Sequence, residues 1–131
     1  YTYSHFKYDR YLNNGEDYSV NRVAGVSRNV VVSRVYIELL YVLRLFIQHN
    51  HTSRIHLNDA NDEYADSFNL LSAKLSYQPA GKSYIPKQIY VFADNILNEK
   101  YSLGNDLNAF GRRYYNAAPA INIQVGESWE F

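Results

Sequence analysis

The chain has 131 residues, in which 13 basic side chains balance 13 acidic ones and 14 tyrosines raise the aromatic fraction to 16%. Balanced charge excludes the one-sided positive field that nucleic-acid binding needs, so no nucleic-acid partner is expected. The absence of cysteine excludes disulfides and thiolate sites, and no segment is apolar for long enough to form a transmembrane helix.

The first predicted strand covers residues 1–9, which alternate with period two between two mixed faces. Residues 13–15, Asn-Asn-Gly, give a strong turn signal. The polar run that follows shows little periodicity. We therefore expect residues 13–28 to form a connection.

The next predicted strand is long and covers residues 30–55. Its central part, from Tyr36 to Ile47, fits a helix and a strand equally well over a short window. The β-branched entry at 30–32 and the polar exit at 48–54 favour one long strand. Arg44 lies inside this apolar run and must point away from its apolar neighbours to be tolerated.

The second half of the chain alternates predicted strands with polar connections. Apolar and polar residues alternate most regularly at 71–78, where one face should meet an apolar environment and the other water. The other predicted elements are a loop at 56–67, a turn at 79–87, a strand at 88–96, a loop at 102–111 and a last strand at 113–131. The sequence therefore predicts an all-β fold, an antiparallel meander of about five long strands, with two open edges that other strands must pair.

Four stretches carry a resemblance to a known family. They are Ser53–Asn61, Asp94–Tyr101, Gly111–Asn116 and the terminal Phe131. In this order they resemble the closing strands of TonB-dependent outer-membrane receptors. The resemblance implies that residues 1–131 are a C-terminal fragment of such a transmembrane β-barrel of roughly 22 strands, without the plug domain and the earlier strands.

The resemblance also implies a topology. Residues 13–28 and 79–87 would face the periplasm, and the loops at 56–67 and 102–111 would lie outside the cell. Outer-membrane lipid would surround the wall. Trp129 and Phe131 would form the aromatic signal that the barrel assembly machinery recognises.

The function that the resemblance implies is transport across the bacterial outer membrane. The receptor would import an iron–siderophore complex or a similar scarce nutrient, and the TonB energy-coupling complex would act through an N-terminal region outside these residues. The sequence shows no nucleophile with His and Asp partners, no phosphate-binding loop and no catalytic carboxylate pair, so no enzymatic activity is expected.

Polar residues of the predicted external loops are the candidates for ligand binding. They are Arg54, Asn58, Asp59, Asp62, Glu63, Asp66, Asn105, Asp106 and Arg112. Oxygen ligands suit hard cations, and arginine pairs with anionic chelators. A solvated loop is the alternative interpretation. The spacing lacks the pattern of a calcium-binding loop, and no resident metal or cofactor is expected.

Three histidines and one basic-aromatic stretch allow further alternatives. His49, His51 and His56 suit a transition-metal site, or are polar residues tolerated at a strand end. Residues 112–115, Arg-Arg-Tyr-Tyr, suit an anionic ligand, but an interfacial aromatic girdle is favoured.

Two residues depart from the pattern of the family. Arg44 interrupts an apolar run, and Glu127 falls on the same face as Val125 and Trp129, where a carboxylate is costly in lipid. These departures keep a second hypothesis open. In it the chain is a soluble β-sandwich or small β-barrel binding module whose apolar faces form a core.

Overall fold

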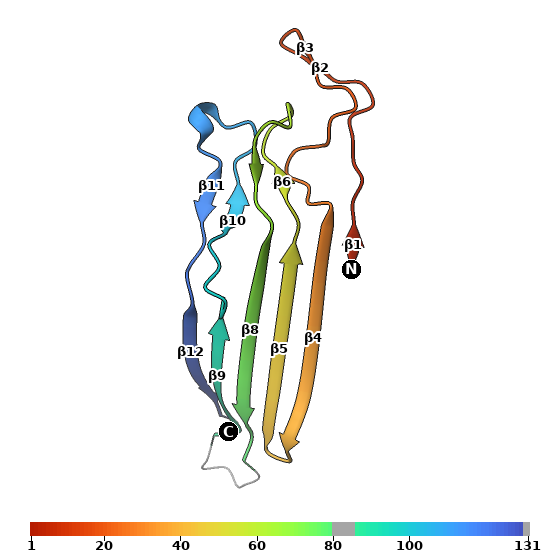
Figure 1. The fold of residues 1–131 in the computed structure, drawn as a ribbon. Coiled ribbons are helices and arrows are strands. Elements are labelled where there is room, and N and C mark those ends of the chain that lie inside the picture. The colour runs from red at the N-terminus through yellow and green to blue at the C-terminus, as the bar shows by residue number, and fades with distance from the viewer. Residues whose placement is uncertain (80–85, 130–131) are drawn as a thin grey trace. The chain divides into compact units, whose positions relative to one another are not determined.

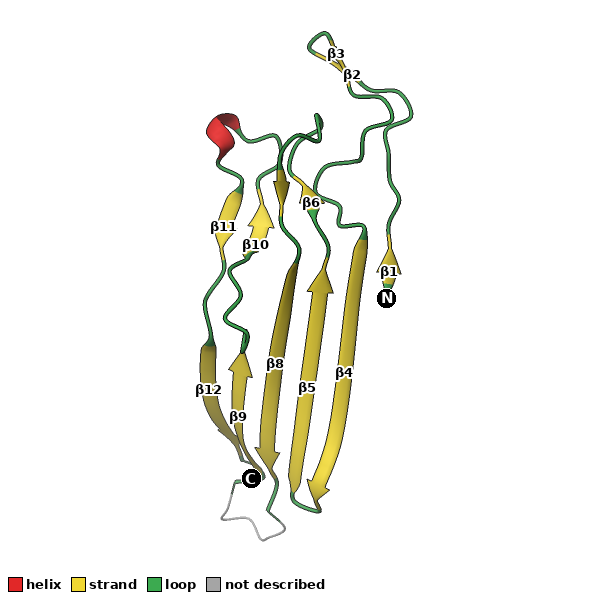
Figure 2. Cartoon of the chain, viewed as in Figure 1, coloured by secondary structure: helices red, strands yellow, loops and turns green. Residues whose placement is uncertain are grey.

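The computed structural model describes residues 1–79 and 86–129, and strands dominate these residues (Figure 1). The only helix in the described part is the short 3₁₀ turn η1 (Phe110–Arg112), drawn red in Figure 2. No helix among the described residues is long and apolar enough to cross a membrane. The predicted all-β class is confirmed.

The chain divides into two compact units. The first, here called the loop unit, comprises Tyr1–Val31, His51–Phe68 and Lys100–Ala118. The second, the sheet unit, comprises Val32–Asn50, Asn69–Glu99 and Pro119–Phe131.

A six-stranded sheet contains all the long strands, in the order β1-β4-β5-β8-β9-β12. The long strands are β4 (Asn29–Leu40), β5 (Leu43–Thr52), β8 (Phe68–Tyr77), β9 (Gln88–Asp94) and β12 (Asn122–Ser128). They lie side by side in one layer in Figure 1, and β1 (Thr2–Tyr3) adds two residues at one edge. The predicted meander of about five long strands is confirmed.

The prediction of one long strand at 30–55 is wrong. Residues 30–55 form the hairpin of β4 and β5, which reverses at Tyr41 and Val42. The turn contains no Gly, Pro or Asn, so the usual turn signals are missing. Because both arms alternate with the same period, the reversal leaves no break in the pattern.

Side-chain contacts join the two arms of this hairpin. The Tyr36 and Phe46 rings lie 4.8 Å apart between centroids, and Arg44 Nε lies 3.4 Å from Glu38 Oε1. Arg34 donates a hydrogen bond of 2.7 Å to Gln48. Arg44 therefore lies on the polar face, away from the leucines that flank it, as its register predicts.

The extra reversal changes which connections lie together. Residues 13–28 were expected opposite to 56–67, but both segments belong to the loop unit. The Gly25 amide donates a hydrogen bond of 2.8 Å to the His56 carbonyl. The prediction that 13–28 lies on the opposite side from the external loops is therefore wrong, because a hairpin replaces a single strand.

The predicted strand at 1–9 is a strand only at Thr2–Tyr3. Beyond it the chain pairs irregularly with the segment that returns to β4. The backbone bonds are Ser4 N to Arg28 O (2.9 Å), Val23 N to Phe6 O (3.2 Å) and Tyr8 N to Asn21 O (3.0 Å). At the tip, β2 (Leu12–Asn13) and β3 (Glu16–Asp17) enclose Asn14 and Gly15, whose φ values of 52° and 85° confirm the predicted turn.

The other two loops also contain short ladders. Strand β6 (Ile55–His56) pairs with β7 (Tyr64–Ala65), and β10 (Ser102–Asn105) pairs with β11 (Tyr115–Ala117). The predicted last strand at 113–131 is thus divided into β11 and β12. A small apolar core forms where Leu57 is fully buried against Ala65 and Tyr114.

The two faces of the sheet unit differ in polarity. The register aligns Leu75 with Val91 and Val91 with Val125, and all three are exposed. The next row, on the opposite face, consists of Lys74, Phe92 and Gln124. Every residue classed as buried in the described part of this unit is polar, namely Ser72, Ser76 and Asn95.

Candidate functional site

The centre of the loop unit is the buried carboxylate of Asp59. Its Oδ1 accepts a hydrogen bond of 2.7 Å from the Tyr8 hydroxyl, and its Oδ2 accepts one of 2.9 Å from Asn108 Nδ2. The Tyr11 hydroxyl donates a longer bond of 3.3 Å to Oδ2. The Asp59 amide in turn donates to Asn108 Oδ1 at 3.0 Å. One side chain thus joins three loops.

Asn61 makes a second tie between the same segments. Its side chain accepts from the Arg22 amide at 2.7 Å and donates to the Arg22 carbonyl at 2.9 Å, as a paired strand residue would. Asn61 has a φ of 61°, a left-handed conformation that asparagine tolerates better than most residues. Asn21 adds a bond of 2.9 Å to the Asp59 carbonyl.

Asp59 changes the acidity of both tyrosines. The hydrogen bond to Asp59, followed by burial and the nearby negative charge, raises the pKa of Tyr8 from 10.0 to about 12. Burial, followed by the charge and hydrogen bond of Asp59, raises the pKa of Tyr11. Both hydroxyls therefore stay protonated at neutral pH and donate hydrogen bonds to Asp59. Each oxygen of the Asp59 carboxylate thus has a partner within the protein.

An open polar pocket of about 230 Å³ lies beside Asp59. Its lining residues are Asn13, Tyr18, Asn58, Asp59, Ala60, Asn108, Ala109 and Tyr114. Two of the residues predicted from the sequence, Asn58 and Asp59, are among them. The pocket is the place in the loop unit where side-chain amides, hydroxyls and aromatic rings converge.

Four other predicted ligand residues, Arg54, Asp62, Glu63 and Arg112, are not in the pocket lining and have partners of their own. Asn58 Nδ2 donates a hydrogen bond to the Asp62 carboxylate. Arg112 Nε lies 3.1 Å from Glu63 Oε1, and the guanidinium of Arg54 lies 4.1 Å from the Tyr64 ring centroid.

The remaining candidates, Asp66, Asn105 and Asp106, do not join the pocket lining. Asp66 and Asp106 are exposed. Asn105 buries its Oδ1 without a hydrogen-bond partner. The predicted set is therefore divided between pocket residues, surface pairs and solvated carboxylates.

The three histidines do not form one group. His49 contacts Asn69 Oδ1 at 3.2 Å in the sheet unit, whereas His56 lies in β6 of the loop unit. Burial, and then the positive charges of Arg22 and Arg54, lower the pKa of His56. Within residues 1–79 and 86–129 no group of three or more His, Cys, Asp or Glu side chains is placed to hold a metal ion.

The aromatic residues at the end of the chain have different environments. Tyr114 is 6% exposed in the core of the loop unit, so its predicted place in an interfacial girdle is wrong: Leu57 and Ala65 give it a packed site. The Tyr115 hydroxyl donates to the Tyr64 carbonyl at 3.2 Å. Trp129 is exposed, and Phe131 lies outside the described residues.

The sequence analysis missed the two tyrosines that bond Asp59, Tyr8 and Tyr11. It also missed the pocket residues Asn13, Tyr18 and Asn108. The density of tyrosine and asparagine in residues 8–21 could have indicated a binding segment. The sequence, however, predicted residues 13–28 on the side opposite to the loop at 56–67.

Searches of protein-family models and of curated proteins find no match for this chain.

Proposed function

We propose that the chain forms wall and external loops of an outer-membrane β-barrel receptor of the TonB-dependent kind, which imports an iron chelate or a similar scarce nutrient. The observation that carries the proposal is the inverted polarity of the sheet unit. Val125 is 73% exposed and Ile123 65% exposed, while Ser72 and Ser76 are buried. A barrel wall in lipid has this arrangement, with apolar side chains outward and polar side chains toward an aqueous interior.

Aromatic side chains at one end of the sheet support the proposal. Tyr41 follows β4, Tyr77 ends β8 and Trp129 follows β12, and all three are exposed. These are alternate strands of an antiparallel sheet, so their C-terminal ends lie together. Tyrosine and tryptophan concentrate at membrane–water interfaces.

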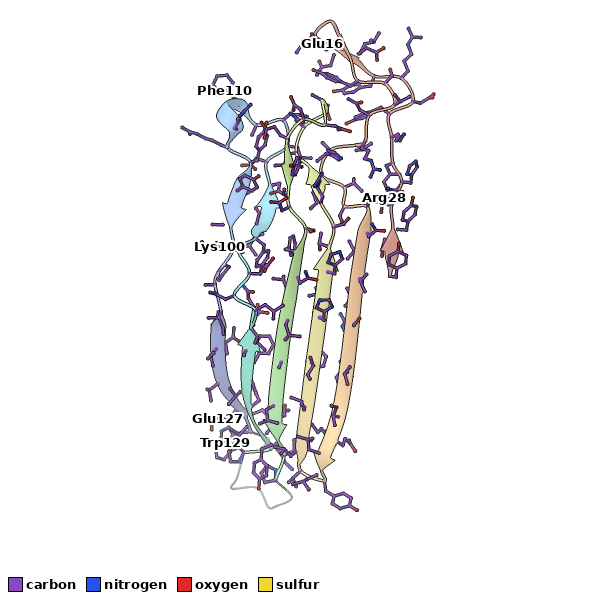
Figure 3. The ribbon with its side chains drawn as sticks, in the orientation of Figure 1. Glu16, Arg28, Lys100, Phe110, Glu127 and Trp129 are labelled. Atoms are coloured by element: carbon purple, nitrogen blue, oxygen red, sulfur yellow. The ribbon has the colours of Figure 1, made fainter. Side chains whose placement is uncertain are left out.

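The same placement accounts for the departure at Glu127. Glu127 pairs with Ile89, the second residue of β9, and lies beside Trp129 at this end of the sheet (Figure 3). An arginine or lysine on the lipid face costs about 2–4 kcal/mol at the midplane and about 0–1 kcal/mol near the interface, and an acidic residue costs less. The carboxylate is therefore compatible with a lipid-facing strand.

Within this proposal the loop unit supplies the external loops. The TonB complex, the barrel assembly machinery and outer-membrane lipid are the partners proposed for the receptor. The candidates for contact with the imported ligand are Asn58 and Asp59 at the pocket and the arginines Arg54 and Arg112 of the same unit.

The alternative is a soluble β-sandwich or small β-barrel binding module, in which further protein covers the apolar face. Fractionation of cells that make the protein separates the two functions. We expect the protein to sediment with the outer membrane after mild lysis, to resist a high-salt wash and to need detergent for release. A soluble periplasmic protein and a porin are the controls. Recovery in the soluble fraction without detergent would overturn the proposal.

A further inference from the structure

We infer that the pocket beside Asp59 binds a neutral, hydroxyl-rich ligand, such as a single sugar ring or a similar polyol. The inference names the ligand class for the loops that the proposed function places outside the cell. It rests on that proposal only for the direction of transport. The binding chemistry itself comes from the pocket.

Charge is the first argument. Asp59 is the one ionisable carboxylate in the lining, and neither lysine nor arginine belongs to the lining set. Two arginines of the same unit have other partners, since Arg112 pairs with Glu63 and Arg54 covers the Tyr64 ring. An anionic ligand would meet a carboxylate without a compensating cation, which disfavours binding.

Unused hydrogen-bonding capacity is the second argument. The Asn13 side chain makes one long bond of 3.4 Å, from Nδ2 to the Tyr11 hydroxyl, and its Oδ1 has no partner among the described residues. Asn58 and Asn108 each use one side-chain N–H, to Asp62 and Asp59, so a second N–H remains on each. The pocket therefore offers neutral donors and acceptors, which hydroxyl groups satisfy in both directions.

Aromatic lining and size give the third argument. Tyr18 belongs to the lining and is only partly buried, so its ring can pack against the apolar C–H face of a sugar ring. At about 230 Å³ the pocket is smaller than the roughly 300–1,000 Å³ of sites for drug-sized ligands. Asn108 is held by Asp59 and Tyr114 by Leu57, so the site is preorganised.

Saturation-transfer NMR on the detergent-solubilised protein tests the inference. The neutral probes are methyl α-glucoside, methyl α-galactoside, methyl α-mannoside and myo-inositol, and the anionic probes are glucuronate, citrate and ferric citrate. We expect at least one neutral probe to bind in the millimolar range. The anionic probes should bind more weakly by about tenfold or more, because the pocket contains no counter-charge.

Two variants localise the binding. Asn13→Ala and Tyr18→Phe each remove one polar group and leave the bonds of Asp59 intact, so each should weaken binding about fivefold without a change in melting temperature. Asn122→Ala, in β12 of the sheet unit, is the matched control and should bind as wild type.

Three outcomes would overturn the inference: no binding of any neutral probe, unchanged binding in both variants, or tighter binding of an anionic probe that the variants weaken. Binding of a neutral probe by a protein that does not associate with the membrane would support the pocket inference and overturn the proposed transport function. Membrane association without binding of a neutral probe would support the proposed function and overturn the pocket inference.

Discussion

At the residue scale, Asp59 connects three loops, because its carboxylate oxygens are bonded to side chains of the protein. Its carboxylate accepts bonds from Tyr8, Tyr11 and Asn108, which lie 51, 48 and 49 residues away in the chain. Removal of this acceptor leaves its donors without their hydrogen-bond partner, which destabilises the folded loops. The arrangement of the loops therefore depends on this side chain together with Asn61 and Asn21.

The raised pKa of Tyr8 makes the loop unit sensitive to alkaline pH. Since the folded pKa lies at about 12 against an ordinary 10.0, the hydrogen bond contributes its full stability below pH 10 and loses it as pH rises toward 12. Tyrosinate absorbance should show one fewer group titrating near pH 12 in Tyr8→Phe than in wild type.

Asp59→Asn is the control for this titration. It removes the negative charge and weakens the acceptor, so the Tyr8 pKa should fall back toward its ordinary value. A wild-type difference spectrum in which Tyr8 titrates near pH 10 would contradict the hydrogen bond to Asp59.

The sequence located part of the candidate site correctly, for identifiable reasons. Asn58 and Asp59 were found because acidic and amide residues gather in a loop between two strands. Their partners were not found, because contacts across about 50 residues depend on which connections lie together. The sequence separated residues 13–28 from 56–67 because Tyr41 and Val42 were taken as strand interior, whereas both segments belong to the loop unit.

At the element scale, the strands with strict alternation were the predictable ones. β8 and β9 form where the period of two is clear, and Asn14-Gly15 forms the turn that its residues specify. The β4–β5 reversal was not predictable, because its turn residues are apolar and aromatic. Tyr41 is fully exposed there, which suits an interfacial turn better than a soluble one.

Asn95 organises the connection that follows β9, in the stretch that carries the family resemblance. It is 2% exposed with a φ of 47°, and its side chain bonds Glu99 N and O, both at 2.9 Å, and Pro119 O at 3.2 Å. The side-chain amide of Asn95 therefore joins residues 95–99, which follow β9, to Pro119, which precedes β12. The residue type follows from the backbone conformation and the bonds together.

Substitution of Asn95 should destabilise the sheet unit. Asn95→Ala loses three hydrogen bonds and strains the left-handed backbone, so we expect a loss of about 3 kcal/mol in the free energy of unfolding, measured by denaturant titration in detergent. Asn95→Gly keeps the backbone conformation without strain and should lose about 1 kcal/mol less. Unfolding within about 0.5 kcal/mol of wild type in Asn95→Ala would refute this role.

At the scale of the whole molecule, the distribution of burial separates the two units. The loop unit has a small apolar core around Leu57, whereas the buried residues of the sheet unit, within its described part, are polar. A single-layer sheet with one continuous apolar face gains little from burial by itself and needs an apolar environment on that face. An exposed apolar surface of this extent marks a membrane or protein contact.

The environment of the β12 side chains tests most directly whether the apolar face of the sheet unit faces lipid. The protein contains no cysteine, so a single cysteine that carries a nitroxide label can be introduced in turn at Asn122, Ile123, Gln124 and Val125. Each labelled protein is measured in outer-membrane vesicles. We predict that labels at 123 and 125 collide preferentially with oxygen, which concentrates in lipid. Labels at 122 and 124 should collide preferentially with a water-soluble nickel chelate. Labels at 123 and 125 that are shielded from both reagents would contradict a lipid-facing strand and favour a protein core.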